Sequence, residues 1–173
     1  MKIIQFALAL SISAAPVLAH AAKADSPFTP ARRQLGQATQ LIVQGKYAQA
    51  EPFVRQALAL DPSHAEAHYN LGVVLRSTGR QSQAIDAYRS ALELFGPDLS
   101  NHAKCLYGIA LAAEDVGDPE LSARAWRDYL TFTRENRPND PTIAIAQTHL
   151  GVAERVVADL HRRKIPGTQK ATR

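Results

Sequence analysis

The residues of this sequence whose types and spacing best suit chemistry are two histidines in the stretch HAEAH, residues 64–68. On a helix, His64 and His68 lie four positions apart and therefore on one face, as the two imidazoles of a zinc-binding pair do. The order HExxH is absent, and no third ligand is evident. We therefore interpret His64 as a residue at the start of a helix and His68 as a packing residue.

Cys105 is the only cysteine of the chain, so no internal disulfide can form. It lies among Ala103, Leu106 and Ile109 in a helical pattern, and free cysteines are commonly buried. The other serine, histidine and acidic residues are scattered, without the arrangement of a catalytic triad. We predict a protein that is not an enzyme and that holds no metal and no cofactor.

The elements that position these residues repeat along the chain. Apolar residues within each half-repeat are spaced by three and four, as on one face of a helix. Gly79 lies in the stretch STGR between two halves, where glycine most easily adopts a left-handed backbone angle. Each unit is therefore predicted to be a helix, a tight turn and a second helix. Three landmarks recur at an interval of 34 residues: Gly45 and Gly79, Ala50 and Ala84, Ala57 and Ala91.

The ends of these helices are marked by residues that cap or break helices. Thr29-Pro30, Asp118-Pro119 and Asp140-Pro141 each place a capping side chain before a proline suited to the first helical turn. Ser63 followed by Glu66 has the spacing of a capping box. Pro52 falls one turn inside a predicted helix, where it removes a hydrogen bond, so we expect a bend or a late start near Glu51.

The pattern resembles the tetratricopeptide repeat (TPR) family, whose signature combines an aromatic residue, Leu-Gly, Tyr, Ala, a second aromatic residue and Pro. Residues 65–98 match it most closely, residues 31–64 match it less well, and a degenerate third unit starts near Ala103. The small residues of the pattern fall where a larger side chain would push two crossing helices apart. The residues that carry the resemblance are Gly45, Ala50, Pro62, Leu71, Gly72, Gly79, Ala84, Tyr88, Ala91, Gly117 and Trp126.

The resemblance implies an all-α fold, an α-solenoid of about three TPR helical hairpins plus a C-terminal capping helix. We predict one TPR domain over residues 25–164, with repeats at about 31–64, 65–98 and 103–138 and the capping helix at 141–164. A second, thinner apolar stripe of that helix comprises Ile145, Val152 and Val156. We interpret it as plain packing among alanines, with the edge of a partner contact as the alternative.

The first residues, MKIIQFALALSISAAPVLAHAAKA, have a charged start, an apolar stretch and small residues that suit cleavage. We predict a cleaved signal peptide over residues 1–24, and hence an exported protein, periplasmic or secreted. A membrane anchor is the alternative, but Gln5 and Pro16 interrupt the apolar run and no basic stop follows it. We expect no membrane-spanning segment in the mature chain.

The net charge of +4 is concentrated near the C-terminus. Removal of Lys2 and Lys23 leaves +4 − 2 = +2, and removal of the five cations among residues 162–173 leaves +2 − 5 = −3. A basic nucleic-acid-binding face is therefore not expected on the body of the protein. We interpret residues 165–173 as a basic disordered tail that is simply solvated, with weak contact to an anionic membrane surface as the alternative.

The resemblance also implies that the first helix of each hairpin lines a concave groove for an extended peptide or a partner helix. Asn70 and Lys104 match two positions of the carboxylate clamp found in some TPR domains, whereas Leu35, Thr39 and Gly108 do not match the others. For Asn70 a structural role is an equal alternative. The groove positions implied are Arg32, Leu35, Thr39, Tyr69, Asn70, Val73, Arg76, Lys104, Tyr107 and Leu111.

Three functions fit this groove and tail. The favoured one is a non-enzymatic scaffold that binds a protein or peptide ligand in the bacterial cell envelope. A narrower one is a periplasmic assembly chaperone for cytochrome c maturation, a pilus, a secretion system or an outer-membrane complex. The third is attachment to an envelope surface through the basic tail.

Overall fold

The computed structural model describes residues 29–164, so the predicted signal peptide and basic tail lie outside the described residues. This part of the chain contains helices and no strand. The helices are α2 (Pro30–Val43), α3 (Tyr47–Leu60), α4 (Ala65–Ser77), α5 (Gln81–Phe95), α6 (Leu99–Val116), α7 (Pro119–Asn136) and α8 (Thr142–Lys164).

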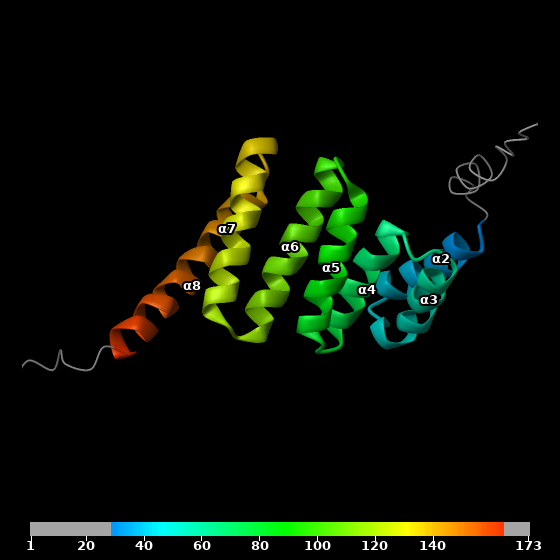
Figure 1. Cartoon of the computed structure of the whole chain (residues 1–173), viewed down its shortest axis with the longest axis horizontal. Coiled ribbons are helices and arrows are strands. Elements are labelled where there is room, and N and C mark those ends of the chain that lie inside the picture. Colours follow the sequence, from blue (N-terminus) through cyan, green and yellow to red (C-terminus); the bar gives the residue numbers. More distant parts are fainter. Residues whose placement is uncertain (1–28, 165–173) are drawn as a thin grey trace, which may run out of the picture.

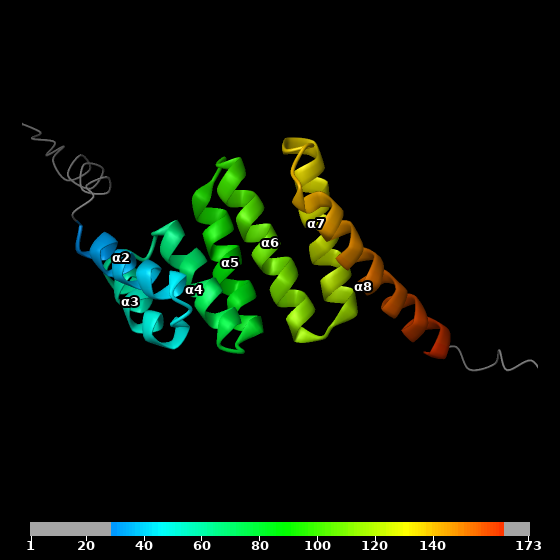
Figure 2. The same ribbon diagram turned by 180° about the vertical axis from the view of Figure 1, so that it is seen from behind.

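Consecutive helices pack side by side along one direction, from α2 at one end to α8 at the other (Figures 1 and 2). The pairs α2–α3, α4–α5 and α6–α7 form three helical hairpins, and α8 packs against α7. The predicted all-α solenoid of three hairpins and a last helix is confirmed. Because each hairpin buries its apolar face only against its neighbours, the chain stacks into one row.

Small residues allow the helices of this row to cross closely. Ala50, Ala57, Ala84 and Ala91 are all fully buried. The ring of Tyr88 lies against α4 and α6 at the same time, in the space that two glycines leave open. A Cβ on Gly72 would meet Tyr88 Cδ1 at 2.6 Å, and one on Gly108 would meet its Cζ at 2.8 Å. The glycines of α4 and α6 therefore define the slot that holds this ring.

Most helix ends follow the capping pattern of the sequence. Thr29 and Asp118 accept backbone N–H bonds at the starts of α2 and α7, as predicted. Gly79 and Gly117, with φ of 81° and 78°, end α4 and α6 in the left-handed conformation that other residues rarely adopt. Asp98 caps α6 with bonds from Ser100 and Asn101, so this helix begins at Leu99, before Ala103. The first helix of the third unit is thus longer than the first helix of the second unit.

Two local predictions are wrong. The capping box of Ser63 and Glu66 does not form, because the Ser63 amide and hydroxyl both donate to Asp61 Oδ1 and α4 starts after His64. The late start of α3 near Glu51 is also wrong, because α3 begins at Tyr47 and continues through Pro52. Pro52 is the sixth residue of α3, so it removes the bond to the Ala48 carbonyl in the second turn without ending the helix.

The last helix has the register of a first hairpin helix. In α4 and α6, two buried residues seven apart, Ala67 with Val74 and Cys105 with Ala112, mark one face of the helix. Ala146 and Ala153 repeat this spacing in α8 and are also buried. Leu71-Gly72 follows four residues after Ala67, and Leu150-Gly151 follows four residues after Ala146. In the described part of the chain, α8 therefore occupies the place of the first helix of a fourth hairpin.

Candidate partner-binding surface

The residues expected to line a groove lie on the first helices α2, α4 and α6, with different exposure. Arg32 and Lys104 are exposed, and Leu35 and Asn70 are buried. The half-buried members are Thr39, Tyr69, Val73, Arg76, Tyr107 and Leu111.

A hollow between α4 and α6 brings several of these residues together. Its volume is about 150 Å³. It combines a cation from Lys104, a carboxylate from Glu66, two side-chain amides and two aromatic rings. The lining residues are Glu66, Tyr69, Asn70, Phe95, Asn101 and Lys104. We refer to this set as the α4–α6 hollow.

Asn70 has a structural role in this hollow. Its Nδ2 donates to Thr39 Oγ1 at 3.2 Å, and that hydroxyl donates to the Leu35 carbonyl at 2.9 Å. The bond joins α4 to α2 across the boundary between hairpins. One N–H of its amide nitrogen is therefore engaged, which leaves the second N–H and the carbonyl oxygen for a ligand.

Lys104 is positioned by the start of its own helix. Its Nζ donates to Asn101 Oδ1 at 3.1 Å, and Asn101 Nδ2 donates to Asp98 Oδ2 at 2.9 Å. Backbone and side-chain hydrogen bonds, chiefly that from the Asn101 N–H, lower the pKa of Asp98. The lysine thus lies at the end of a polar chain along the rim, exposed and able to donate to an incoming acceptor.

The two tyrosines expected to contact a ligand are also part of the core. The ring of Tyr69 lies 5.6 Å from that of Tyr88, and burial raises the pKa of Tyr69. Tyr107 makes edge contacts with Trp126 and Tyr129, at ring distances of 5.6 and 5.2 Å. Truncation of either tyrosine would therefore disturb packing as well as any binding surface.

Arg76 and Arg32 lie apart from the hollow. Arg76 Nε donates to Asp115 Oδ2 at 2.7 Å and so joins α4 to α6. Arg32 is exposed in the first turn of α2, where its N–H donates to the Thr29 cap. The structure therefore brings Tyr69, Asn70 and Lys104 together, and it leaves these two arginines elsewhere.

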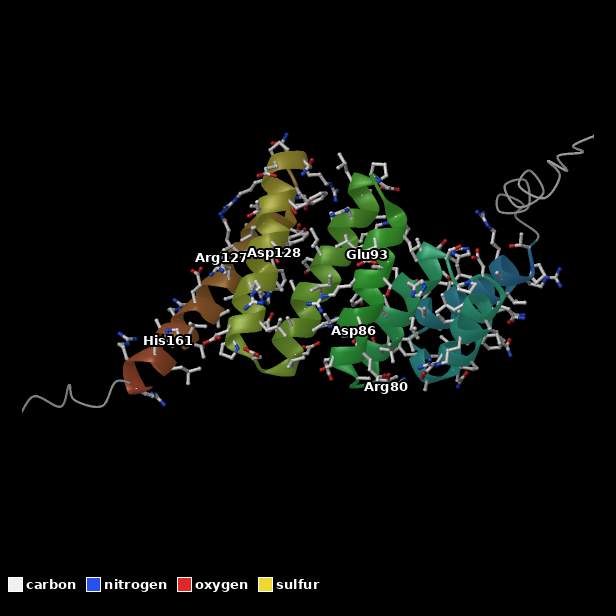
Figure 3. The ribbon with its side chains drawn as sticks, in the orientation of Figure 1. Arg80, Asp86, Glu93, Arg127, Asp128 and His161 are labelled. Carbon is white, nitrogen blue, oxygen red and sulfur yellow. The ribbon has the colours of Figure 1, made fainter. Side chains whose placement is uncertain are left out.

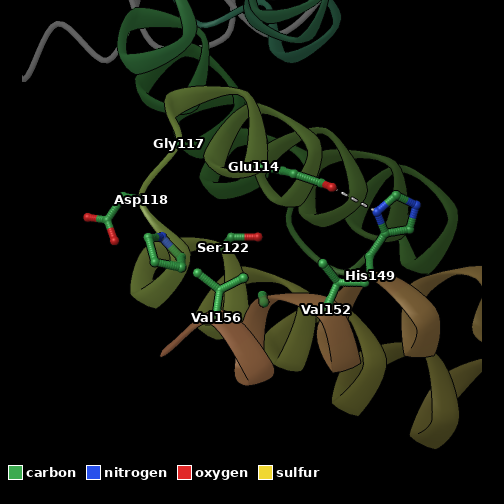
Figure 4. A pocket seen from close by; sticks show the side chains of 9 residues that line it. Glu114, Gly117, Asp118, Ser122, His149, Val152 and Val156 are labelled. Carbon is green, nitrogen blue, oxygen red and sulfur yellow. Dashed lines mark hydrogen bonds and ion pairs between the residues drawn. The ribbon is translucent and has the colours of Figure 1, made fainter. Parts of the chain in front are cut away.

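A second hollow, absent from our sequence-based prediction, opens between the α6–α7 turn and α8 (Figure 4). We call it the α8 wedge. Its volume is about 170 Å³. The lining residues are Glu114, Gly117, Asp118, Pro119, Ser122, His149, Val152, Ala153 and Val156.

Glu114 is the central polar residue of the α8 wedge. Its carboxylate accepts from Trp126 Nε1 at 3.3 Å and lies 2.8 Å from His149 Nδ1. The ring of His149 stacks on Trp126 at 4.7 Å between centroids. These contacts join α6, α7 and α8. Leu150-Gly151 was the signal in the sequence that could have placed α8 beside the groove.

The residues first examined for chemistry are used in packing. His68 Nε2 lies 2.8 Å from the Pro62 carbonyl oxygen. Among residues 29–164, no three His, Cys, Asp or Glu side chains gather as a metal site would require. Cys105 is fully buried, and burial raises the pKa of its thiol to about 11.

Comparison with known proteins agrees with this architecture. Residues 35–98 match a family model described as tetratricopeptide repeat. Residues 35–98 therefore carry tetratricopeptide repeats, and the fold is a TPR solenoid. The crystal structure of the Sgt2 TPR domain from Aspergillus fumigatus is similar, with a TM-score of 0.61 at 16% identity over 84% of this chain and 91% of that one. No curated protein matches the sequence.

The TPR fold is that of a protein–protein interaction scaffold, which builds extended surfaces from stacked hairpins. In this solenoid the α4–α6 hollow lies between the first helices of the second and third hairpins. The α8 wedge lies one unit further along, beside the third hairpin. Over residues 29–164, no helix is long and apolar enough to cross a membrane.

Proposed function

We propose that this TPR protein is a non-enzymatic scaffold of the bacterial cell envelope that holds an extended peptide or a partner helix. The binding surface is formed by the first helices of its hairpins. The observation that carries the proposal is the α4–α6 hollow, which gathers an exposed lysine, an amide acceptor and an aromatic ring from two successive hairpins. Such a site offers a partner hydrogen bonds, charge and flat apolar area together.

The contact geometry favours a peptide over a small molecule. A cavity of about 150 Å³ is smaller than the roughly 300–1,000 Å³ of typical small-molecule sites. It suits one or two side chains or a chain terminus. The rest of the contact would then extend along Val73 and Leu111, which are half-buried on the same helices.

The location of the protein is proposed from its N-terminal layout. A charged start, an apolar stretch and the small residues Ala19, Ala21, Ala22 and Ala24 suit export and cleavage. N-terminal sequencing of protein recovered from the periplasm of a bacterial host tests this directly. Cleavage after Ala21 or Ala24 supports export, and an intact Met1 in the cytoplasmic fraction contradicts it.

Photocross-linking tests the binding site. Glu66, an exposed residue that lines the α4–α6 hollow, is replaced by p-benzoylphenylalanine, which leaves Lys104 and the core side chains in place. The matched control carries the same group in place of Arg89, an exposed residue of α5. We expect a cross-linked partner from cells that make the position 66 variant and none from cells that make the position 89 variant.

The identity of that partner separates the envelope functions. A subunit of a cytochrome, pilus, secretion or outer-membrane complex would make the protein an assembly chaperone. A partner captured equally from both positions would contradict the groove. Loss of the partner on deletion of residues 165–173 would instead favour attachment through the tail.

A further inference from the structure

The α8 wedge exists because α8 diverges from α6. The first helices α2 and α4, and likewise α4 and α6, approach each other directly, with Cα atoms within 8 Å. No Cα atom of α8 comes that close to α6, and only side chains such as Glu114 and His149 bridge the gap. Towards its far end α8 leaves the row at an angle (Figure 1). The opening is therefore a built feature of the last junction.

Apolar residues of α8 face this opening and remain exposed. Val152 and Val156 line the wedge and are 45% and 43% exposed, and Ile145 on the same stripe is 50% exposed. Within α8 the register assigns Val152 the place that Val73 has in α4 and Leu111 in α6. The stripe thus continues the surface formed by the first helices. Ala146 and Ala153 already supply the buried face of α8, so this stripe is not required for the fold.

The rim of the wedge is negatively charged. Two of its lining residues are carboxylates, Glu114 and Asp118, and none is lysine or arginine. The C-terminus of α6 and the N-terminus of α7 both lie here, so their opposite partial charges offset and the negative charge of the rim comes from the two carboxylates. Glu114 is 41% exposed despite its contacts with Trp126 and His149. It can therefore accept a further hydrogen bond from a cation.

We propose that the α8 wedge docks a segment of a partner protein in which an aliphatic side chain lies next to a lysine or arginine. The aliphatic group enters between Val152, Val156 and Pro119, and the cation meets Glu114, while Asp118 adds negative charge on the opposite side of the opening (Figure 4). A volume of about 170 Å³ is too small for typical small-molecule ligands. This inference rests on the proposed function and adds a second, chemically distinct contact point for its partner.

The two hollows thus select different parts of one ligand. The α4–α6 hollow offers Lys104, which recognises acceptors, beside the carboxylate of Glu66. The α8 wedge offers apolar contact beside Glu114 and Asp118, with His149 as the one titratable base in its lining. Complementary charge also speeds association and discriminates against acidic competitors.

Selection from a random peptide library tests the proposal without a known ligand. The purified protein is panned against 12-residue peptides displayed on phage, and the enriched peptides are measured by titration. We expect enrichment of Leu, Ile, Val or Met beside Lys or Arg. The double variant Val152→Thr/Val156→Thr keeps the shape of the side chains but adds hydroxyls, and it should weaken binding about tenfold, which equals roughly 1.4 kcal/mol.

Val43→Thr is the matched control, because Val43 is 82% exposed on α2 and the substitution is identical. It should leave the affinity unchanged. Asp118→Asn retains a capping side chain for α7 while removing the charge, so it should weaken binding of the basic peptides and reduce its salt dependence.

Each outcome of these experiments supports or overturns the wedge proposal. The wedge proposal is overturned if the enriched peptides are acidic. It is also overturned if their affinity is unchanged in both the valine double variant and Asp118→Asn. If such peptides are lost instead with Lys104→Gln, the proposed groove stands and only the wedge falls. If no peptide is enriched, the wedge proposal fails, and the photocross-linking at position 66 decides the proposed function separately.

Discussion

The junction between the first two hairpins and the junction between the third hairpin and α8 rest on different ion pairs. In the first, Glu51 of α3 accepts from Arg80 Nη1 at 2.9 Å and from Nη2 at 2.5 Å. In the second, Glu114 of α6 faces His149, which is charged only when protonated. The first pair has a permanent cation in a two-point geometry, and the second has a titratable ring stacked on an indole.

The first junction includes a half-buried ion pair. The side chain of Glu51 is only 18% exposed, and it also pairs with Arg55. The Arg80 hydrogen bonds are the main reason that the pKa of Glu51 falls from 4.5 to about 2. The bond from Asn70 to Thr39 crosses the same boundary. The first two hairpins are therefore joined by charge and by hydrogen bonds.

At the last junction the buried contacts of α8 are apolar, through Ala146 and Ala153, and the ion pairs lie at the surface. Besides His149, the contacts of α8 with the third hairpin include Arg127 with Glu154 at 2.9 Å and His161 with Glu120 at 3.3 Å. Arg127 and His161 point outward in Figure 3, and their side chains are 56% and 60% exposed. Exposed pairs of this kind contribute little to stability. In a solenoid, each unit is stabilised by its nearest neighbours, so α8 depends on the third hairpin alone. Its angle to that hairpin leaves the α8 wedge open.

The largest difference in stability between the two junctions is expected from substitutions in the two Leu-Gly pairs, Leu71-Gly72 of α4 and Leu150-Gly151 of α8. Gly72→Ala places a methyl group 2.6 Å from the Tyr88 ring, which is itself confined by Gly108. We expect a loss of about 2–3 kcal/mol of unfolding free energy. Gly151→Ala meets no atom within 4 Å, so its effect should be a gain of up to about 1 kcal/mol from helix propensity.

Denaturant unfolding of both variants measures these changes. Equal destabilisation by the two alanines would mean that α8 is packed as tightly as α4. In that case, α8 would not be an unpaired first helix.

The repeat landmarks predicted the fold because small residues and turn glycines are local requirements that recur wherever helices cross. Gly72 and Tyr88 could be assigned from the resemblance to the TPR signature. The partners of Glu51 and Glu114 could not, because they lie 29 and 35 residues away and depend on side-chain conformations. The failed capping box has a similar cause, since Asp61 competes for the same serine.

Removal of the Glu51 charge at the first junction should have the second largest effect on the free energy of unfolding. Glu51→Gln keeps the size of the side chain but loses the charged two-point contact with Arg80, and we expect a cost of about 2 kcal/mol at pH 7. Because the folded-state pKa lies below 4.5, the contribution is present above that pH and is lost as the pH falls toward 2.

Unfolding curves of wild type and Glu51→Gln at pH 7 and pH 2.5 check this. The difference between the two proteins should shrink in acid. A difference that is the same at both pH values would mean that the Glu51 charge does not stabilise the first junction.

A smaller change is expected at the last junction. His149→Gln retains a donor for Glu114 but removes the ring that covers Trp126, the only tryptophan of the chain. Unfolding free energy should fall by only about 0.5 kcal/mol, while Trp126 emission shifts to the red as water approaches the indole. His161→Gln, at an exposed position of the same helix, should leave the emission unchanged. An unshifted spectrum in His149→Gln would show that the stack is not formed in solution.

The smallest effect is expected in the labelling rate of Cys105. This residue of α6 reports on the junction between the second and third hairpins, which lies between the two junctions compared above. Its thiol lies near Tyr69 and Tyr88, and its pKa of about 11 keeps it protonated at pH 8. A disulfide reagent therefore reacts only when α6 separates from its neighbours. His149→Gln should change the labelling rate by less than about twofold, because opening at α8 does not expose this face of α6. Gly72→Ala, which strains the Tyr88 slot, should accelerate labelling. Acceleration by His149→Gln instead would mean that α8 and the second hairpin open as one unit, and the two junctions would then not be independent.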